Sequence, residues 1–277
     1  MTEIDPGTLN DWQVVGCLDE LPEGRPLATR LLGQAISVRR RGRSAVVSAG
    51  GRDLPVLLRY GFVWTSLGMP KGDLFAIPEY DEADRRNLNG CSFGVQVSAP
   101  RAVENFLDMG HFPFVHTGIL GAEPHTEVKD YDVETMPAEI VATRCMFYQP
   151  QAAVASTGGA DVAYRYRVPH PYCAVLYKDS PAKPGRADVI ALFIQPVTED
   201  EIVASLVLSL LDDDTPLAEL RRFQQRIFAQ DKPILENQIP KRLPLLPRAE
   251  VPIRADKVSI AYRHWLRGRG VTYGVIA

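Results

Sequence analysis

Two histidines and an aspartate lie within nine residues of one another in a strongly apolar stretch, residues 105–116 (NFLDMGHFPFVH). They are Asp108, His111 and His116. Burying an imidazole without a partner is costly, so this stretch requires hydrogen-bond acceptors or a metal ion beside it. Imidazole donors, and the absence of the HExxH pattern of zinc peptidases, favour iron as that metal. The alternative is a pair of core histidines satisfied by hydrogen bonds alone.

The spacing predicts which of these side chains meet. Asn105, Asp108 and His111 stand at i, i+3 and i+6, so a helix through this stretch would place them on one face. His116 follows His111 by five residues, about 140° away on an ideal helix at ~100° per residue. Pro113 lies between the two histidines and would break or end the helix. Such a break would allow His116 to turn back toward His111.

A further carboxylate stands far downstream in an apolar helical stripe. Asp231 lies in the middle of this stripe, whose apolar members recur at intervals of three or four: Leu220, Phe223, Ile227, Ile234 and Leu235. A carboxylate in such a position must be paired, protonated or bound to a metal. One alternative is an ion pair with a neighbouring arginine. Two histidines and one distant aspartate form the facial triad of non-haem Fe(II) oxygenases.

The rest of the chain predicts mainly antiparallel β-structure. Short strands separated by glycine-rich turns are expected in residues 11–75. Residues 126–210 contain at least five strand-like runs and a possible sixth at 172–177. Several of these runs alternate polar and apolar residues, which is typical of an antiparallel sheet with one solvated face. We therefore expect a small β domain at residues 1–75 and an α+β domain at residues 76–277.

Composition excludes several classes of protein. With 277 residues, 45% of them hydrophobic, the chain can bury a sizeable core. A net charge of −3 gives no electrostatic case for a nucleic-acid or anionic-membrane partner. The first residues lack the features of a signal peptide, and no apolar run is long enough to span a bilayer. The four cysteines are scattered without a CxxC pair. We expect a soluble cytoplasmic protein.

Several ordered motifs resemble the Rieske-type aromatic-ring oxygenase α subunits, in their phthalate and vanillate demethylase-like branch. Residues 105–121 resemble the iron-binding segment of that family, residues 228–238 its carboxylate-ligand helix, and residues 254–266 its C-terminal helix. Stretches nearer the N-terminus resemble the edges of the family's N-terminal domain: residues 11–15, 21–27 and 60–64. The resemblance covers nearly the whole chain.

The resemblance implies that His111, His116 and Asp231 bind a mononuclear Fe(II), with open positions for O2 beside the substrate. Asp108 would orient a ligand histidine and face the electron donor, and Asn105 would line the same face. The implied fold is α+β, of the helix-grip (START-like) type. In it an antiparallel sheet wraps a long C-terminal helix, behind a small truncated β remnant of a Rieske domain.

The chain departs from the family in one respect. A Rieske [2Fe–2S] cluster needs two cysteines and two histidines, arranged in this family as CxH followed by CxxH. Neither pattern occurs, and the first histidine is His111. We therefore expect no [2Fe–2S] cluster in this chain. In this it is similar to the cluster-less oxygenase components of bacterial 7-methylxanthine N-demethylases, which borrow the Rieske centre of their reductase.

The resulting hypothesis is an oxygenase component that activates O2 for N- or O-demethylation, or hydroxylation, of a small aromatic or purine substrate. Its electrons would come from a separate Rieske-containing reductase or oxygenase subunit. A self-sufficient Fe(II) dioxygenase and a non-catalytic subunit of an oxygenase complex are the alternatives. The family's head-to-tail trimers imply a homo- or hetero-oligomer. The basic cluster at residues 39–43 is either a solvated hairpin end or a docking patch.

Overall fold

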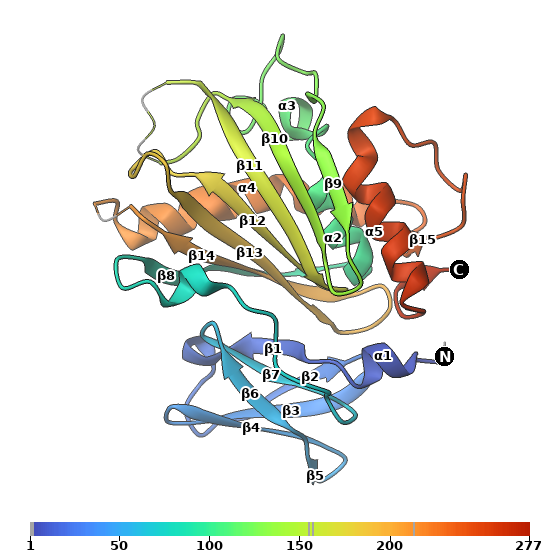
Figure 1. Ribbon diagram of the computed structural model, residues 1–277. Coiled ribbons are helices and arrows are strands. Elements are labelled where there is room, and N and C mark those ends of the chain that lie inside the picture. The colour runs from blue at the N-terminus through green and yellow to red at the C-terminus, as the bar shows by residue number, and fades with distance from the viewer. Residues whose placement is uncertain (1–2, 155, 157, 213) are drawn as a thin grey trace.

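The computed structural model describes residues 3–154, 156, 158–212 and 214–277. Its largest element is a seven-stranded sheet in the order β8-β14-β13-β12-β11-β10-β9, with every neighbouring pair antiparallel (Figure 1). The strands are β8 (Arg86–Val95), β9 (Asp132–Thr135), β10 (Ile140–Gln149), β11 (Ala160–His170), β12 (Cys173–Asp179), β13 (Ala187–Pro196) and β14 (Ile202–Leu210). Because six of the seven follow one another as neighbours from β9 to β14, most of the sheet is a simple meander.

Two smaller sheets precede the large one and lie beneath it in Figure 1. One has the order β1-β7-β6 and the other β2-β3-β4-β5. Their strands are β1 (Gln13–Cys17), β2 (Leu27–Leu31), β3 (Gln34–Arg41), β4 (Ser44–Ala49), β5 (Arg52–Asp53), β6 (Val56–Arg59) and β7 (Phe62–Thr65). The expected β-structure of the first 75 residues is confirmed. The division into domains at residues 1–75 and 76–277 stays a prediction.

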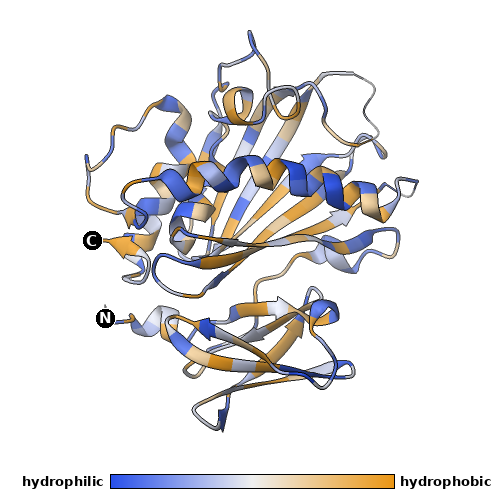
Figure 2. Cartoon of the chain, turned by 180° about the vertical axis from the view of Figure 1, so that it is seen from behind, coloured by the Kyte–Doolittle hydropathy of each residue, from blue (hydrophilic) through white to orange (hydrophobic). Residues whose placement is uncertain are grey.

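The helices lie mainly on one face of the large sheet. They are α1 (Pro6–Leu9), α2 (Ala99–Leu107), α3 (Phe112–Val115), α4 (Leu217–Asn237) and α5 (Lys257–Gly268). The longest, α4, crosses the sheet and packs on β8, as the view from behind in Figure 2 shows. The α+β class with a mostly antiparallel sheet is confirmed. The long helix is not the last element, since α5 follows it and packs on β9 and β10. Among the helices that the structure describes, none is long and apolar enough to cross a membrane.

The central strands of the large sheet are buried on both faces. Ile190 of β13 faces the helices and the cavity beneath them. Val189 and Phe193, which point to the opposite face, pack in one buried cluster with Phe62 and Trp64 of β7. Strands β10 and β11, by contrast, alternate buried with more exposed residues. The expected solvated face is therefore wrong for β12–β14, because the N-terminal sheets cover it.

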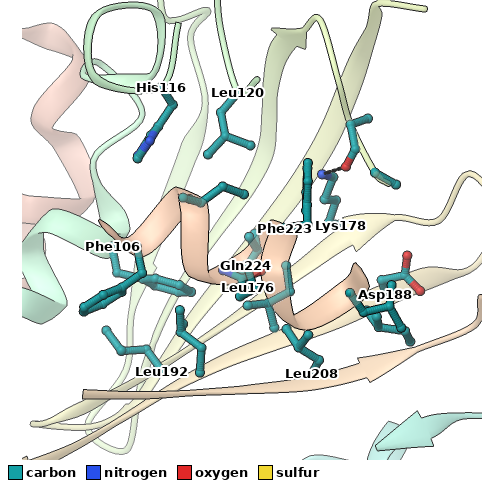
Figure 3. A pocket seen from close by; sticks show the side chains of 18 of the residues that line it. Phe106, His116, Leu120, Leu176, Lys178, Asp188, Leu192, Leu208, Phe223 and Gln224 are labelled. Carbon is teal, nitrogen blue, oxygen red and sulfur yellow. Dashed lines mark hydrogen bonds between the residues drawn. The ribbon is translucent and has the colours of Figure 1, made fainter. Parts of the chain in front are cut away.

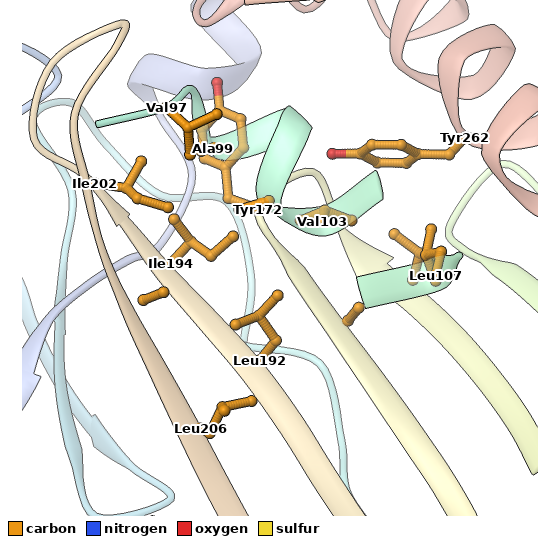
Figure 4. Close-up of a cluster of buried hydrophobic side chains, with 14 of the residues drawn as sticks. Val97, Ala99, Val103, Leu107, Tyr172, Leu192, Ile194, Ile202, Leu206 and Tyr262 are labelled. Carbon is orange, nitrogen blue, oxygen red and sulfur yellow. The ribbon is translucent and has the colours of Figure 1, made fainter. Parts of the chain in front are cut away.

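Helix α2 is held between the sheet and α5 by apolar contacts (Figure 4). Val103 and Leu107 of α2 are fully buried in the same cluster as Ile194 of β13 and Tyr262 of α5. The Tyr262 hydroxyl donates to Pro171 O at 2.5 Å, so the ring is fixed as well as buried. This packing determines where the chain leaves α2 and enters residues 108–116.

The packing of the N-terminal sheets on the large sheet predicts a stability effect. Phe193 is fully buried and its ring centroid lies 5.0 Å from that of Trp64. We expect Phe193→Ala to lower the free energy of unfolding by about 3–5 kcal/mol in urea denaturation, because it removes a core aromatic ring and leaves a cavity. Phe114→Ala is the matched control, since Phe114 is 64% exposed and its loss should cost about 0.5 kcal/mol or less. Equal effects of the two changes would contradict the prediction.

Candidate metal centre

The chain between α2 and α3 turns in a way that the expected single helix does not describe. Helix α2 ends at Leu107, and Asp108 is its C-cap with extended backbone. The Asp108 Oδ1 atom accepts a hydrogen bond from Gly110 N at 2.7 Å, which forms a tight turn. Pro113 stands in the first turn of α3, where the absence of an N–H costs nothing. It therefore helps to start a short helix rather than to end a long one.

This turn brings together the three predicted ligands. His111 and His116 flank α3, and their Nε2 atoms lie 3.1 Å apart. Asp231 of α4 places its Oδ1 atom 3.3 Å from His111 Nε2 and 3.1 Å from His116 Nε2. The three donor atoms lie within 4.8 Å of one another, so one metal ion can contact all of them.

The outer nitrogen of each histidine is hydrogen-bonded. His111 Nδ1 donates to Asp108 Oδ2 at 3.0 Å, and His116 Nδ1 donates to Gln230 Oε1 at 3.0 Å. Both imidazoles thus direct Nε2 toward the cluster, where a metal ion could bind once that nitrogen is unprotonated. The predicted contact of Asp108 with His111 is present, although a turn and not a helical face creates it. The contact of Gln230 with His116 was not predicted. Neighbouring residues of a helix point about 100° apart, so Gln230 was not expected to face the same cluster as Asp231.

Asp231 is 8% exposed and accepts a hydrogen bond from Asn105 Nδ2 at 3.1 Å. Burial alone raises the pKa of this carboxyl, but hydrogen bonds to His111 and His116 outweigh burial and lower the pKa to about 2. Asp231 is therefore ionised at neutral pH. The alternative of an arginine partner does not hold, since its neighbours are the two imidazoles and Asn105.

The same contacts act on His111 in the opposite direction. Burial lowers the pKa of His111, but hydrogen bonds to the carboxylates of Asp108 and Asp231 outweigh it and raise the pKa to about 9. Without a metal, the cluster therefore retains a proton at neutral pH. A divalent cation would take the place of that proton and leave the charge balance of the cluster favourable.

The cluster lies on the wall of a cavity of about 390 Å³ between α4 and the large sheet (Figure 3). This volume is within the range of about 300–1,000 Å³ that is usual for small-molecule sites. Most of its lining is apolar and includes Phe106, Leu192 and Phe228. Besides the cluster and Asn105, polar side chains line the cavity at Tyr164, Tyr166, Lys178, Asp188, Asp212, Asp214, Thr215 and Gln224. Sequence reasoning assigned none of them, because it cannot determine which strand residues share a face.

Asp108 connects the cluster to the surface. Its side chain is 33% exposed and lines a groove of about 460 Å³ formed by α2, α5 and residues 245–252. Asn105 lines both this groove and the cavity. The path from the groove through Asp108 to His111 is thus a single hydrogen bond long.

A sheet crossed by a long helix, with a His-His-Asp cluster on the wall of the cavity between them, is the arrangement of the catalytic domain of Rieske-type oxygenases. Residues 95–270 match the family described as the vanillate O-demethylase oxygenase C-terminal domain, and this chain belongs to that family. Its relatives are demethylases, and the chain is an oxidoreductase of the oxygenase class.

Named relatives and solved structures agree with this assignment. The chain is 47% identical over 272 residues to the probable methylxanthine N7-demethylase NdmC of Pseudomonas sp. (strain TJI-51), covering 96% of both chains. It is 28% identical to the methylxanthine N1-demethylase NdmA of Pseudomonas putida, over 76% of this chain and 58% of NdmA. Its fold is similar to the structure of Pseudomonas putida CBB5 NdmA with caffeine (TM-score 0.77, 20% identity, 93% of this chain and 90% of that chain).

The raised pKa of His111 predicts pH-dependent metal binding. His111 must lose its Nε2 proton to bind a cation, so the apparent affinity for Fe(II), or for Mn(II) as an air-stable probe, should rise up to about tenfold per pH unit between pH 7 and 9. Above about pH 9 the affinity should level off. Anaerobic titration calorimetry in buffers of different ionisation enthalpy measures both the affinity and the released proton. Affinity that does not change with pH over this interval would contradict the prediction.

Proposed function

We propose that this chain is the oxygenase component of an N-demethylase, with a methylxanthine-type purine as substrate, one Fe(II) as metal and a separate protein as electron donor. The observation that carries the proposal is the convergence of His111, His116 and Asp231 on the wall of an apolar cavity of suitable volume. The name of the 47% identical relative, a probable methylxanthine N7-demethylase, supports the choice of substrate.

The chemistry of the donors fits iron. Two imidazole nitrogens and one carboxylate oxygen form the 2-His-1-carboxylate set of non-haem Fe(II) oxygenases, which leaves coordination positions for other ligands. No thiolate is part of the donor group among the residues that the structure describes. When bound there, iron would supply the redox chemistry for O2 activation next to the substrate.

The residues of the chain prepare this site. Asp108 and Gln230 hold the imidazoles in the tautomer that leaves Nε2 free, and such contacts typically change metal affinity or activity 10–100-fold. Asn105 fixes one oxygen of Asp231. The apolar side chains around the cavity would limit the access of water once a substrate is bound, which protects reactive species from side reactions. A purine that fills the cavity would therefore meet O2 in a dry environment.

The stoichiometry of the reaction requires an external electron donor. Oxidative N-demethylation consumes a methylated nitrogen, O2, two electrons and two protons, and gives the N–H compound, formaldehyde and water. This chain contains no CxH and no CxxH pattern that could hold a Rieske cluster. The donor would therefore be a different polypeptide that carries such a centre.

We infer that this donor docks at the groove beside Asp108. Asp108 lines the groove and contacts His111 directly, whereas the other side of the cluster faces the mostly apolar cavity. The groove carries exposed apolar side chains at Leu246 and Val251, which are 54% and 91% exposed. The basic cluster at residues 39–43 is a poorer candidate, because it lies on β3 and the turn after it and none of its residues lines this groove. In a trimer, a neighbouring subunit would face the same groove.

Turnover experiments test the proposal. With Fe(II), 7-methylxanthine and a Rieske-containing reductase, one formaldehyde should form per O2 consumed, and omission of the reductase should abolish O2 uptake in an oxygen electrode. His111→Ala and Asp231→Ala should bind less than about a tenth of the iron and lower turnover more than about 100-fold, since each removes a ligand.

Different outcomes have different meanings. O2 uptake with substrate alone would refute the partner requirement and favour a self-sufficient dioxygenase. Full iron binding by Asp231→Ala would refute the assignment of the ligands, whatever the activity.

The docking face predicts a separable effect on the partner. Val251→Glu should raise the reductase concentration needed for half-maximal turnover about tenfold or more, because it places a carboxylate in an apolar contact. Iron content and turnover at saturating reductase should stay near those of the unchanged protein. Ile239→Glu is the matched control, since Ile239 is 93% exposed and does not line the groove. Equal responses to the reductase in both variants would place the docking face elsewhere.

A further inference from the structure

A charged pair interrupts the apolar floor of the cavity at one end. Lys178 of β12 stands directly opposite Asp188 of β13 and is flanked on its other side by Tyr164 of β11. The next row of residues on the same face is much less polar, with Leu176 paired to Ile190. Lys178 and Asp188 are 6% and 8% exposed, so the floor ends in a buried cation and a buried carboxyl group.

The lysine is incompletely satisfied by the protein. Its ammonium group has three N–H donors, and within the described residues its hydrogen-bond acceptor is the backbone oxygen of Ala152 (Figure 3). Burial lowers the pKa of Lys178 to about 8, while Asp188 opposes this effect. Asp188 accepts a hydrogen bond from Leu211 N at 2.8 Å. Both groups line the cavity, so each can also contact a molecule that occupies it.

A purely structural role does not account for this pair. Taking a charge out of water is expensive, and an apolar side chain of similar volume is often neutral or better for stability. The hydrogen bond to Ala152 O uses one of the three N–H donors of Lys178. The other two donors can therefore bind a ligand in the cavity. The pair also lies at the opposite end of the view from His116 in Figure 3, where it can hold the part of a substrate that does not react.

We propose that Lys178 and Asp188 form a recognition site for the dione edge of the substrate, with the Lys178 ammonium donating to a ring carbonyl oxygen and the Asp188 carboxylate accepting from the adjacent ring N–H. Directly opposed strand residues have Cβ atoms about 4.5–5.5 Å apart, so two neighbouring groups on one ring edge can be contacted together. This inference rests on the proposed purine N-demethylase function.

The site predicts a choice among methylated purines. A substrate whose pyrimidinedione nitrogens carry hydrogen can donate to Asp188, whereas N-methylation at that edge removes the donor and places a methyl group against a buried carboxylate. Such a substrate would bind with its imidazole-ring methyl group toward His116. Purines methylated on the dione ring would be poor ligands.

Binding to the metal-free full-length chain tests the inference without iron or reductase. Titration calorimetry with 7-methylxanthine and with caffeine, which has the same ring system but no dione N–H, gives an affinity ratio for each variant. We expect the unchanged protein to prefer 7-methylxanthine. Lys178→Met should weaken the binding of 7-methylxanthine about tenfold or more, because this change removes a charged hydrogen-bond donor. Asp188→Asn should lessen the preference over caffeine at least about threefold.

Lys129→Met is the control, since Lys129 is an exposed lysine whose side chain is 55% accessible. The ratio of the two affinities is measured within each variant, so it does not depend on the fraction of folded protein.

The metal centre is checked by iron stoichiometry. It is intact if Lys178→Met binds as much iron as the unchanged chain. Unchanged affinity and unchanged preference in both variants would overturn the inference, and so would failure of the unchanged protein to bind 7-methylxanthine. Loss of turnover in iron-loaded protein, with these affinities as expected, would instead contradict only the proposed reaction.

Discussion

The burial of Asp231 is the constraint on which the rest of the molecule depends. An ionised carboxylate inside an apolar helical stripe needs cationic or metal partners, and here His111 and His116 supply them from a segment more than a hundred residues away. Their meeting requires α4 to lie over the sheet and α2 to deliver the following turn to the same place. The apolar contacts of α2 with the sheet and α5 hold that turn in position.

The two-sided burial of the sheet has a functional consequence. Because the N-terminal sheets cover one face of β12 and β13, the opposite face is free to serve as the floor of the cavity. A floor made by rigid central strands can hold a substrate more exactly than a loop can. Lys178 and Asp188 stand on such strands, whereas the candidate metal ligands come from a turn and a helix. The proposed reactive end and the proposed recognition end of the cavity are thus built from different elements.

Much of this arrangement could be predicted from the sequence, and the misses have identifiable causes. The stripe around Asp231 and the dense cluster of His111 and His116 pointed to a shared site because their chemistry is costly to bury alone. The contact of Asp108 with His111 was expected on a helical face but arises from a turn after Leu107. The two buried faces of β12–β14 were missed, since apolar runs do not reveal what covers each face.

The kinds of atoms available follow from the amino-acid sequence: it contains two imidazoles and a carboxylate among apolar neighbours, and it lacks the CxH and CxxH motifs of a Rieske cluster. Side-chain chemistry is a property of each residue, so it can be stated without knowing the fold. The contact of Gln230 with His116, and the position of Lys178 opposite Asp188 in the cavity, follow from the tertiary structure. These pairings depend on helix placement and strand register, where a shift of one residue would turn every side chain to the other face.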